Sequence, residues 1–227
     1  MSMRLIALMC LFAVMIAGCA EVGRKDVGLL IRPGDLLFKD VDCGPMCDAI
    51  EKVTTGYEGA NLSHVGIAAE DENGKIIVLE AVSAGVRAAD LQTFLNKSRD
   101  ANNRPKVMVG RLKEPYRRLI PAAIKEANAL KGKPYDKGFV IDNDAYYCSE
   151  LIYEIFRRAN GGEPVFMLEP MTFKDPKTGQ TLPAWQEYYS KLGVEIPEGK
   201  PGINPGGISR SEALTIVYSF NRPTAKD

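Results

Sequence analysis

Two side chains in this sequence have the chemistry of a cysteine nucleophile and its base. Cys148 lies in "YYCSEL", in the first turn or two of a predicted helix, with Asn143 or Asp144 as the candidate N-cap. A thiol near a helix N-terminus meets the positive end of the helix dipole, which favours the thiolate. His64, in "NLSHVGIAAE", is the only histidine in 227 residues. A buried structural cysteine is the alternative, but Cys148 precedes the apolar face of its helix, so the two residues predict a nucleophile–base pair.

A third group should orient the imidazole, and Glu80 at the end of "KIIVLE" is the candidate. Strand alternation puts His64 and Gly66 on one face. A two-residue turn at 73–74 would pair Ile67 with Glu80 and send the carboxylate to the opposite face. A three-residue loop or a bulge would place Glu80 opposite Gly66 and diagonal to His64, within reach. Assigning Glu80 to the site therefore predicts an irregular hairpin, and an exposed strand-end glutamate is the alternative.

Two further cysteines, Cys43 and Cys47 in "DCGPMCDAIEKV", are four residues apart beside a Gly-Pro pair. In an oxidising compartment they could close a small disulfide loop. Zinc binding, with His64 and Cys148 as additional ligands, is the alternative. The usual zinc knuckle is tighter and comes as two pairs, so the spacing favours a disulfide or free thiols and no metal.

The N-terminus reads as an export signal. A short positive start is followed by the apolar run 5–17, which is too short for a membrane span of ~20 residues but fits the core of a signal peptide. The run ends in "IAGC", which resembles the bacterial lipobox, in which the cysteine becomes lipidated. We therefore expect a signal peptide over 1–18, lipidation at Cys19 and a tether over 19–30. An ordinary signal peptide or a short anchor is the alternative. Ala20 favours the outer membrane if the source is Gram-negative.

Several strands follow one another between two main helices, which predicts an α+β fold rather than alternating βαβ units. The expected strands are 32–38, 64–69, 75–82, 105–112 and 214–220, and the expected helices are 46–56, 119–130, 146–162 and 184–192. We expect a core over 31–160 and a C-terminal extension over 161–227 that completes or caps it. The 29 basic and 29 acidic residues cancel, which argues against a nucleic-acid partner.

Three motifs together resemble one family. "GKPYDKG…YYCSEL" is similar to the nucleophile segment of NlpC-type cysteine peptidases, and "PGDLLF" and "SHVGIA" are similar to two of their strands. In the standard family the cysteine segment comes first, whereas here it comes last. This order resembles the circularly permuted, YiiX-like or YebB-like, papain-fold branch, which has relatives among lecithin retinol acyltransferases. The resemblance implies a papain-like fold in which an antiparallel sheet packs against the nucleophile helix.

The resemblance also implies roles for individual residues. Cys148 would be the nucleophile, His64 the base and Glu80 the orienting acid, with Tyr135 lining the site and helping at the oxyanion. Tyr147 stands where the family has an aspartate that holds a substrate amine, and a phenol cannot make that ion pair. Glu150 is assigned to helix N-terminal charge rather than chemistry.

The sequence therefore predicts a lipid-anchored cysteine peptidase or amidase of the cell envelope, without a cofactor and monomeric. Its expected substrate is a cell-wall peptide or amide. A lipid amidase, esterase or acyltransferase acting on an acyl lipid, and a non-catalytic binding lipoprotein, are the alternatives. Membrane attachment would run through the lipid on Cys19.

Overall fold

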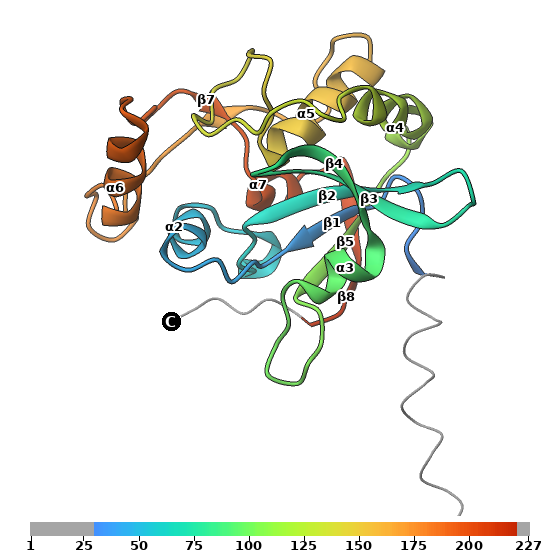
Figure 1. Ribbon diagram of the computed structural model, residues 1–227, viewed down its shortest axis with the longest axis horizontal. Coiled ribbons are helices and arrows are strands. Elements are labelled where there is room, and N and C mark those ends of the chain that lie inside the picture. The colour runs from blue at the N-terminus through green and yellow to red at the C-terminus, as the bar shows by residue number, and fades with distance from the viewer. Residues whose placement is uncertain (1–29, 222–227) are drawn as a thin grey trace, which may run out of the picture.

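The computed structural model describes residues 30–221, and its centre is a six-stranded antiparallel sheet (Figure 1). The strands are β1 (Leu36–Lys39), β2 (His64–Glu70), β3 (Ile76–Val82), β4 (Gly85–Asp90), β5 (Val107–Leu112) and β8 (Leu214–Ser219). Their order across the sheet is β4-β3-β2-β1-β5-β8, and every neighbouring pair is antiparallel. The expected α+β arrangement, an antiparallel sheet with a helix packed on it, is present.

One face of the sheet is covered by α4 (Ile120–Ala129) and α5 (Cys148–Ala159), which lie beside each other in Figure 1. Apolar residues recur along α5 at helical spacing, and four of them are fully buried: Leu151, Ile152, Ile155 and Phe156. Burial of each such side chain contributes about 1.5–3 kcal/mol. The left-handed Gly161, with φ of 69°, lies just past the C-terminus of the helix and ends it within the range 146–162 that the sequence predicts as helical.

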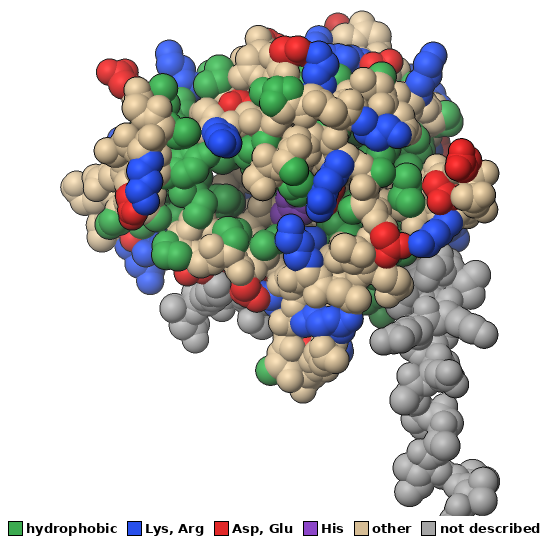
Figure 2. All heavy atoms as spheres, in the orientation of Figure 1, with side chains coloured by type: hydrophobic (Ala, Val, Ile, Leu, Met, Phe, Trp, Pro, Cys, Tyr) green, Lys and Arg blue, Asp and Glu red, His purple; other side chains and the backbone are tan. Residues whose placement is uncertain are grey.

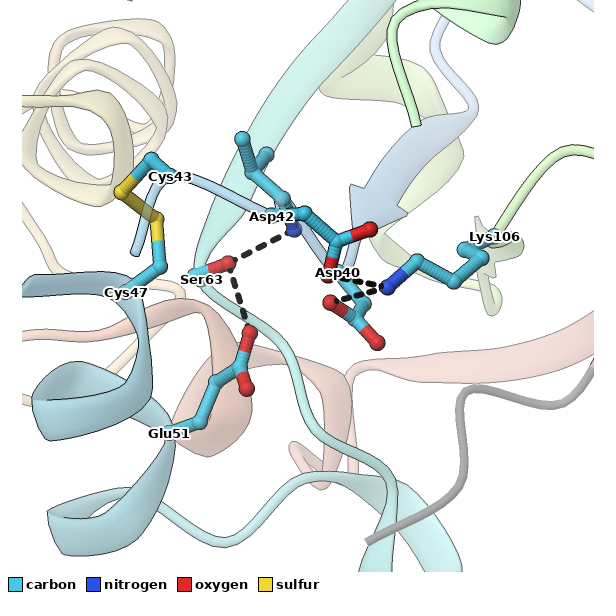
Figure 3. Close-up of a disulfide and its surroundings, with 8 residues drawn as sticks. Asp40, Asp42, Cys43, Cys47, Glu51, Ser63 and Lys106 are labelled. Carbon is cyan, nitrogen blue, oxygen red and sulfur yellow. Dashed lines mark hydrogen bonds and ion pairs between the residues drawn. A yellow bond between two sulfur atoms is a disulfide. The ribbon is translucent and has the colours of Figure 1, made fainter. Parts of the chain in front are cut away.

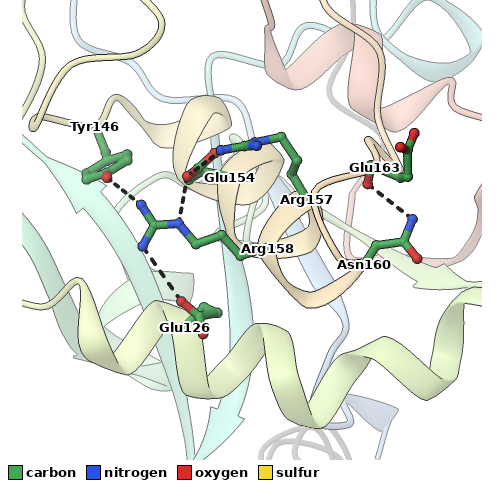
Figure 4. Close-up of polar contacts among 7 residues, drawn as sticks. All are labelled: Glu126, Tyr146, Glu154, Arg157, Arg158, Asn160 and Glu163. Atoms are coloured by element: carbon green, nitrogen blue, oxygen red, sulfur yellow. Dashed lines mark hydrogen bonds and ion pairs between the residues drawn. The ribbon is translucent and has the colours of Figure 1, made fainter.

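Polar contacts fix the outer side of α5 (Figure 4). The Arg158 guanidinium binds Glu154 on its own helix, Glu126 on α4 and the Tyr146 hydroxyl, which it reaches at 3.1 Å. One side chain therefore joins α5 to α4 and to the segment that leads into the cysteine.

The other face is covered by a short helix, α3 (Leu91–Asn96), which follows β4 directly. Its Phe94 and Leu95 pack with residues of the central strands, among them Leu37 and Val78. Neither β4 nor α3 is among the expected elements. The sequence of β4, "GVRAAD", has only one strongly apolar residue, and the six residues of α3 are too few to show a helical period. The Asp90 carboxylate caps α3 by accepting a hydrogen bond from Thr93.

The C-terminal extension takes part in both the sheet and the surroundings of the cysteine. Its last strand, β8, pairs with β5 at the edge of the sheet. Its other elements are the pair β6 (Glu169–Pro170) and β7 (Pro201–Gly202), α6 (Pro183–Leu192) and α7 (Pro205–Ser209). The hydroxyls of Tyr188 and Tyr189 on α6 donate to the carbonyls of Lys137 and Gly138, ahead of α5. In residues 30–221, no helix has the length and apolar character needed to cross a membrane.

Candidate active site

Cys148 is the first residue of α5, and its side chain is 6% exposed. The N-cap is Tyr147, so the expectation of Asn143 or Asp144 is wrong by three to four residues. The reason is that the approach segment folds on itself: Asp144 pairs with Lys133, and the Asn143 side chain accepts from the Ala145 N–H. The sulfur therefore sits at the helix terminus itself, where the backbone N–H groups are unpaired.

Behind the cysteine, Glu150 completes the start of the helix. Its Oε2 accepts a hydrogen bond from the Tyr147 N–H at 3.3 Å. Burial raises the pKa of Glu150 to about 8. At neutral pH this residue is therefore mostly protonated, and it contributes a cap hydrogen bond rather than the full negative charge expected from the sequence.

His64 opens β2 and is held by Glu80 of β3, with 2.7 Å between Nε2 and Oε2. The register of the hairpin pairs Ile67 with Leu79, which brings Gly66 opposite Glu80. The loop is a three-residue one, closed by a hydrogen bond from the Asp71 N–H to the Lys75 carbonyl. The predicted irregular hairpin is therefore confirmed, and Glu80 lies diagonal to the imidazole on one face of the sheet.

Gly66 provides the room for this contact. A Cβ at this position would lie 2.6 Å from Cγ1 of Val78 and 3.4 Å from Cβ of Glu80. The small residue beside the imidazole thus accommodates β3. Helix α5 instead packs with the residues on the opposite face of β2, Val65 and Ile67.

The pKa shifts of Glu80, His64 and Cys148 are consistent with one another. Burial alone would raise the pKa of Glu80, but hydrogen bonds from His64 and Arg87 and the charge of Lys39 lower it to about 2. Burial alone would lower the pKa of His64, yet hydrogen bonds with Cys148 and Glu80 outweigh it, and the pKa is raised. Burial alone would raise the pKa of Cys148, and the contacts with His64 and the Val65 N–H lower it instead. These directions all favour a thiolate–imidazolium pair.

The imidazole therefore lies between a sulfur and a carboxylate. Because Nε2 is engaged by Glu80, Nδ1 is the ring nitrogen that remains for Cys148. The structure brings together the three residues that the sequence proposes as nucleophile, base and orienting acid.

A hydrogen-bonded serine fixes the start of β2 (Figure 3). Ser63 Oγ accepts from the Val41 N–H at 2.9 Å and donates to Glu51 of α2 (Pro45–Val53) at 3.0 Å. Cys43 and Cys47 form a disulfide across the turn that begins α2. The zinc alternative is therefore wrong for these residues, since the two sulfurs bind each other and His64 binds Glu80.

Cys148 opens onto a pocket of about 340 Å³. Its walls come from α2, from the segment before α5 and from the C-terminal extension, and include Ile50, Val53, Phe139, Met171, Phe173 and Trp185. Figure 2 shows the single histidine in purple near the centre, with apolar side chains gathered beside it between α2 and α6. Such a volume lies within the range of small-ligand sites, and its lining is mostly apolar.

Tyr135 and Tyr147 both line this pocket, but they are held differently. Burial, followed by the negative charge of Cys148, raises the pKa of Tyr135 well above its ordinary value, so its phenol stays protonated. The Tyr147 oxygen accepts the Ile203 N–H at 3.1 Å, while Ser149 Oγ donates to the Ile203 carbonyl at 2.9 Å. The two neighbours of the cysteine thus hold the backbone of one residue of the extension, Ile203, against the start of α5.

Sequence reasoning missed two charged residues on the imidazole's face of the sheet. Lys39 pairs with His64 across β1 and β2, and Arg87 pairs with Glu80 across β3 and β4. We call Lys39, His64, Glu80 and Arg87 the charged row. The signal for Lys39 is a lysine at the end of the apolar strand "LLFK", whereas Arg87 lies in a strand that the sequence did not reveal.

The expected lipidation site, Cys19, and the expected signal peptide lie outside the described residues. Within residues 30–221 no group of three or more His, Cys, Asp or Glu side chains could hold a metal ion.

The YaeF/YiiX family of permuted papain-like amidase enzymes matches residues 30–218. The crystal structure of the metalloprotein YiiX from Escherichia coli O157:H7 is similar, with a TM-score of 0.68 and 23% sequence identity over 83% of this chain and 97% of that chain. Among curated proteins, none matches this chain. The expected permuted papain-like fold is confirmed, and the family match continues through most of the C-terminal extension.

Proposed function

The chain belongs to the YaeF/YiiX family of permuted papain-like amidase enzymes, and from that premise we propose that Cys148, His64 and Glu80 form its catalytic triad. The family makes the protein a cysteine hydrolase of the amidase type. The observation that carries the assignment of residues is the imidazole of His64, which contacts Glu80 at 2.7 Å and Cys148 on its other side.

The reaction follows from this order of groups. His64 Nδ1 takes the proton of Cys148, and the thiolate adds to the carbonyl carbon of an amide. The tetrahedral intermediate collapses as the C–N bond breaks, and the imidazolium gives its proton to the leaving amine. Water, deprotonated by His64, then attacks the thioester and releases the acid, which restores the thiol. Glu80 stays ionised throughout and stabilises the imidazolium.

Two kinds of donor are suited to hold the oxyanion. Backbone N–H groups at the start of α5 carry no intrahelical partner and lie next to the sulfur. The Tyr135 phenol stays protonated because its pKa is raised, so it can donate a hydrogen bond to developing negative charge. We assign Tyr135 to this role, with a smaller contribution than that of the backbone groups.

The substrate is an amide of the cell envelope, and the residues of the pocket indicate which kind of acyl group it carries. Tyr147, in place of the aspartate of the standard peptidases, binds the backbone of Ile203 and offers no charge for a free amine. The pocket walls carry many aromatic and aliphatic side chains, and their charged residues are Glu169 and Arg210. These two observations favour a second candidate function, an amidase, esterase or acyltransferase that takes an apolar acyl group, over a peptidase for stem peptides with a free amine.

The location is proposed from the sequence. A positive start, a short apolar run and "IAGC" support cleavage before Cys19 and its lipidation, which would anchor a monomer to the membrane with the site facing the periplasm. Growth with labelled palmitate tests this proposal. Label should enter the wild-type protein and be absent from Cys19→Ala, whereas equal labelling of both would contradict it.

The triad is tested by the reactivity of Cys148 toward limiting iodoacetamide between about pH 4 and 9, read by mass spectrometry of the cysteine peptide. We expect fast alkylation well below pH 8 and a return to ordinary thiol behaviour, with a pKa near ~8.5, in His64→Ala. Glu80→Gln should fall between the two. A Cys148 that stays inert at every pH would refute the triad and leave a non-catalytic binding protein.

The two substrate classes are then separated with matched pairs of substrates. Hydrolysis of cell-wall fragments is compared with hydrolysis of amides and esters that carry short or long acyl chains, each against Cys148→Ala as the blank. A preference for longer chains that disappears in Trp185→Ala supports the acyl pocket. Cleavage of stem-peptide amides alone would reject it.

A further inference from the structure

Lys39 does not contact the triad directly, yet its side chain is buried beside the triad on the same face of the sheet. It ends β1 directly opposite His64, with 1% of its surface exposed. Its Nζ donates to the Phe94 carbonyl at 3.1 Å and lies 3.5 Å from the centroid of the Phe94 ring. The same ring lies 5.9 Å from the imidazole of His64, so one aromatic residue of α3 touches both neighbours.

The ammonium has no ion-pair partner among residues 30–221. A carbonyl and an aromatic face are weak compensation for the lost hydration of a full charge. Burial accordingly lowers the pKa of Lys39 to about 8, although the charge of Glu80 opposes this. Replacing such a group by an apolar side chain of similar size is usually neutral or stabilising, so fold stability does not account for a lysine here.

The charges around Lys39 come from every neighbouring element. Glu80 of β3 and Cys148 of α5 favour the ammonium, while Arg87 of β4 and Lys97 after α3 disfavour it. His64 of β2 lies opposite. A cation in this position favours a thiolate and a carboxylate, and disfavours an imidazolium.

Resting on the proposed triad, we propose that Lys39 is a positioning residue whose buried charge stabilises the Cys148 thiolate and so sets the lower end of the pH range in which the enzyme works. It touches neither substrate nor sulfur. It acts on the sulfur through the electrostatic field around Glu80 and His64. Without the cation, the thiolate forms only at higher pH.

The test is the pH dependence of Cys148 alkylation in Lys39→Met, Lys39→Arg and wild type. We expect the acid limb of Lys39→Met to move up by about one pH unit or more, because at an effective dielectric constant of ~20 a unit charge within roughly 12 Å shifts a pKa by at least that much. Lys39→Arg keeps the charge and should stay on the wild-type curve. Lys75→Met, which removes an exposed lysine of the β2–β3 hairpin, should leave the curve unmoved and serves as the matched control.

Thermal unfolding of the same variants separates charge from packing. We expect Lys39→Met to be at least as stable as wild type while its thiol is harder to ionise, a combination that a structural role would not produce. If Lys39→Met fails to fold, Lys39→Gln carries the same expectation. An unmoved acid limb in a folded neutral variant would overturn the role of Lys39. A wild-type protein without any reactive thiol below pH 8 would instead refute the triad itself.

Discussion

The two faces of the central sheet are built for different purposes. Toward α5, the strands present only apolar side chains. We call this set the helix face; it consists of Leu36, Phe38, Val65, Ile67, Leu79 and Ala81. One residue along each strand, the opposite face presents the charged row, beside an apolar cluster that packs with α3. Both sets are largely buried, but the first is held by packing and the second by hydrogen bonds and ion pairs.

The period of two in a strand makes this separation possible. Val65 and His64 are neighbours in sequence, yet one packs with α5 and the other binds Glu80. The helix face can therefore fix the position of Cys148 without placing any charge in its own core. The difference indicates that stability and chemistry depend on alternate residues of the same strands, and substitutions should separate the two.

The largest expected effect is on chemistry alone. Cys148→Ser should lower amide hydrolysis by roughly 10⁴-fold or more, because a hydroxyl at this site is not activated by the same base. The free energy of unfolding should change little, since the side chain keeps its size. Steady-state rates and denaturant unfolding measure the two. Substantial activity in the serine variant would show that the sulfur is not the nucleophile.

The helix face should behave in the opposite way. Ile155 is fully buried on α5, and Ile155→Ala should lower the free energy of unfolding by about 2–5 kcal/mol through lost burial and a cavity. At a temperature where the variant stays folded, the alkylation rate of Cys148 should match that of wild type. A stable variant with a slow thiol would mean that the two faces are not separate.

Acid should weaken the charged row before the helix face. The pKa of Glu80 falls from 4.5 to about 2 on folding, so its stabilising contribution is complete above pH 4.5 and is lost as the pH falls toward 2. The size of this contribution is roughly 3 kcal/mol. Unfolding of wild type and Glu80→Gln should therefore differ at pH 6 and converge near pH 2. A constant difference across this range would contradict the assigned pKa.

Much of the site could be predicted because its residues obey local rules. A cysteine at a helix start and a lone histidine on a strand specify Cys148 and His64, whereas Glu80 requires a longer hairpin loop than the two-residue turn that Asn73-Gly74 would make. The remaining residues depend on which distant segments meet. The contacts of Tyr147 and Ser149 with Ile203 span 56 and 54 residues, and no local period indicates them.

Lys39 and Arg87 show the same limit on the sheet itself. Both lie beside the triad only because β1 pairs with β2 and β4 pairs with β3 in one register. The N-cap of α5 depends on contacts of the same kind. The polar residues before Tyr147 make local turns and an ion pair with Lys133, which a capping preference alone does not indicate.

The smallest expected effect concerns the outer end of the charged row. Arg87 binds Oε1 of Glu80 through two nitrogens, but its own side chain is 45% exposed. Water can therefore replace much of what Arg87→Met removes, and we expect a loss of about 1 kcal/mol in stability. Activity should fall by less than about tenfold, because His64 still holds the other carboxylate oxygen. Lys75→Met breaks the exposed pair between Lys75 of the β2–β3 loop and Asp90 at the end of β4, and it should have no measurable effect on stability or activity. Unfolding and steady-state rates of the two variants decide whether the row acts as a unit. If Arg87→Met lowers activity as much as Glu80→Gln does, the Glu80 carboxylate is positioned chiefly by Arg87 from the solvent side. The buried residues of the row, Lys39 and His64, then contribute less to its position than their burial implies.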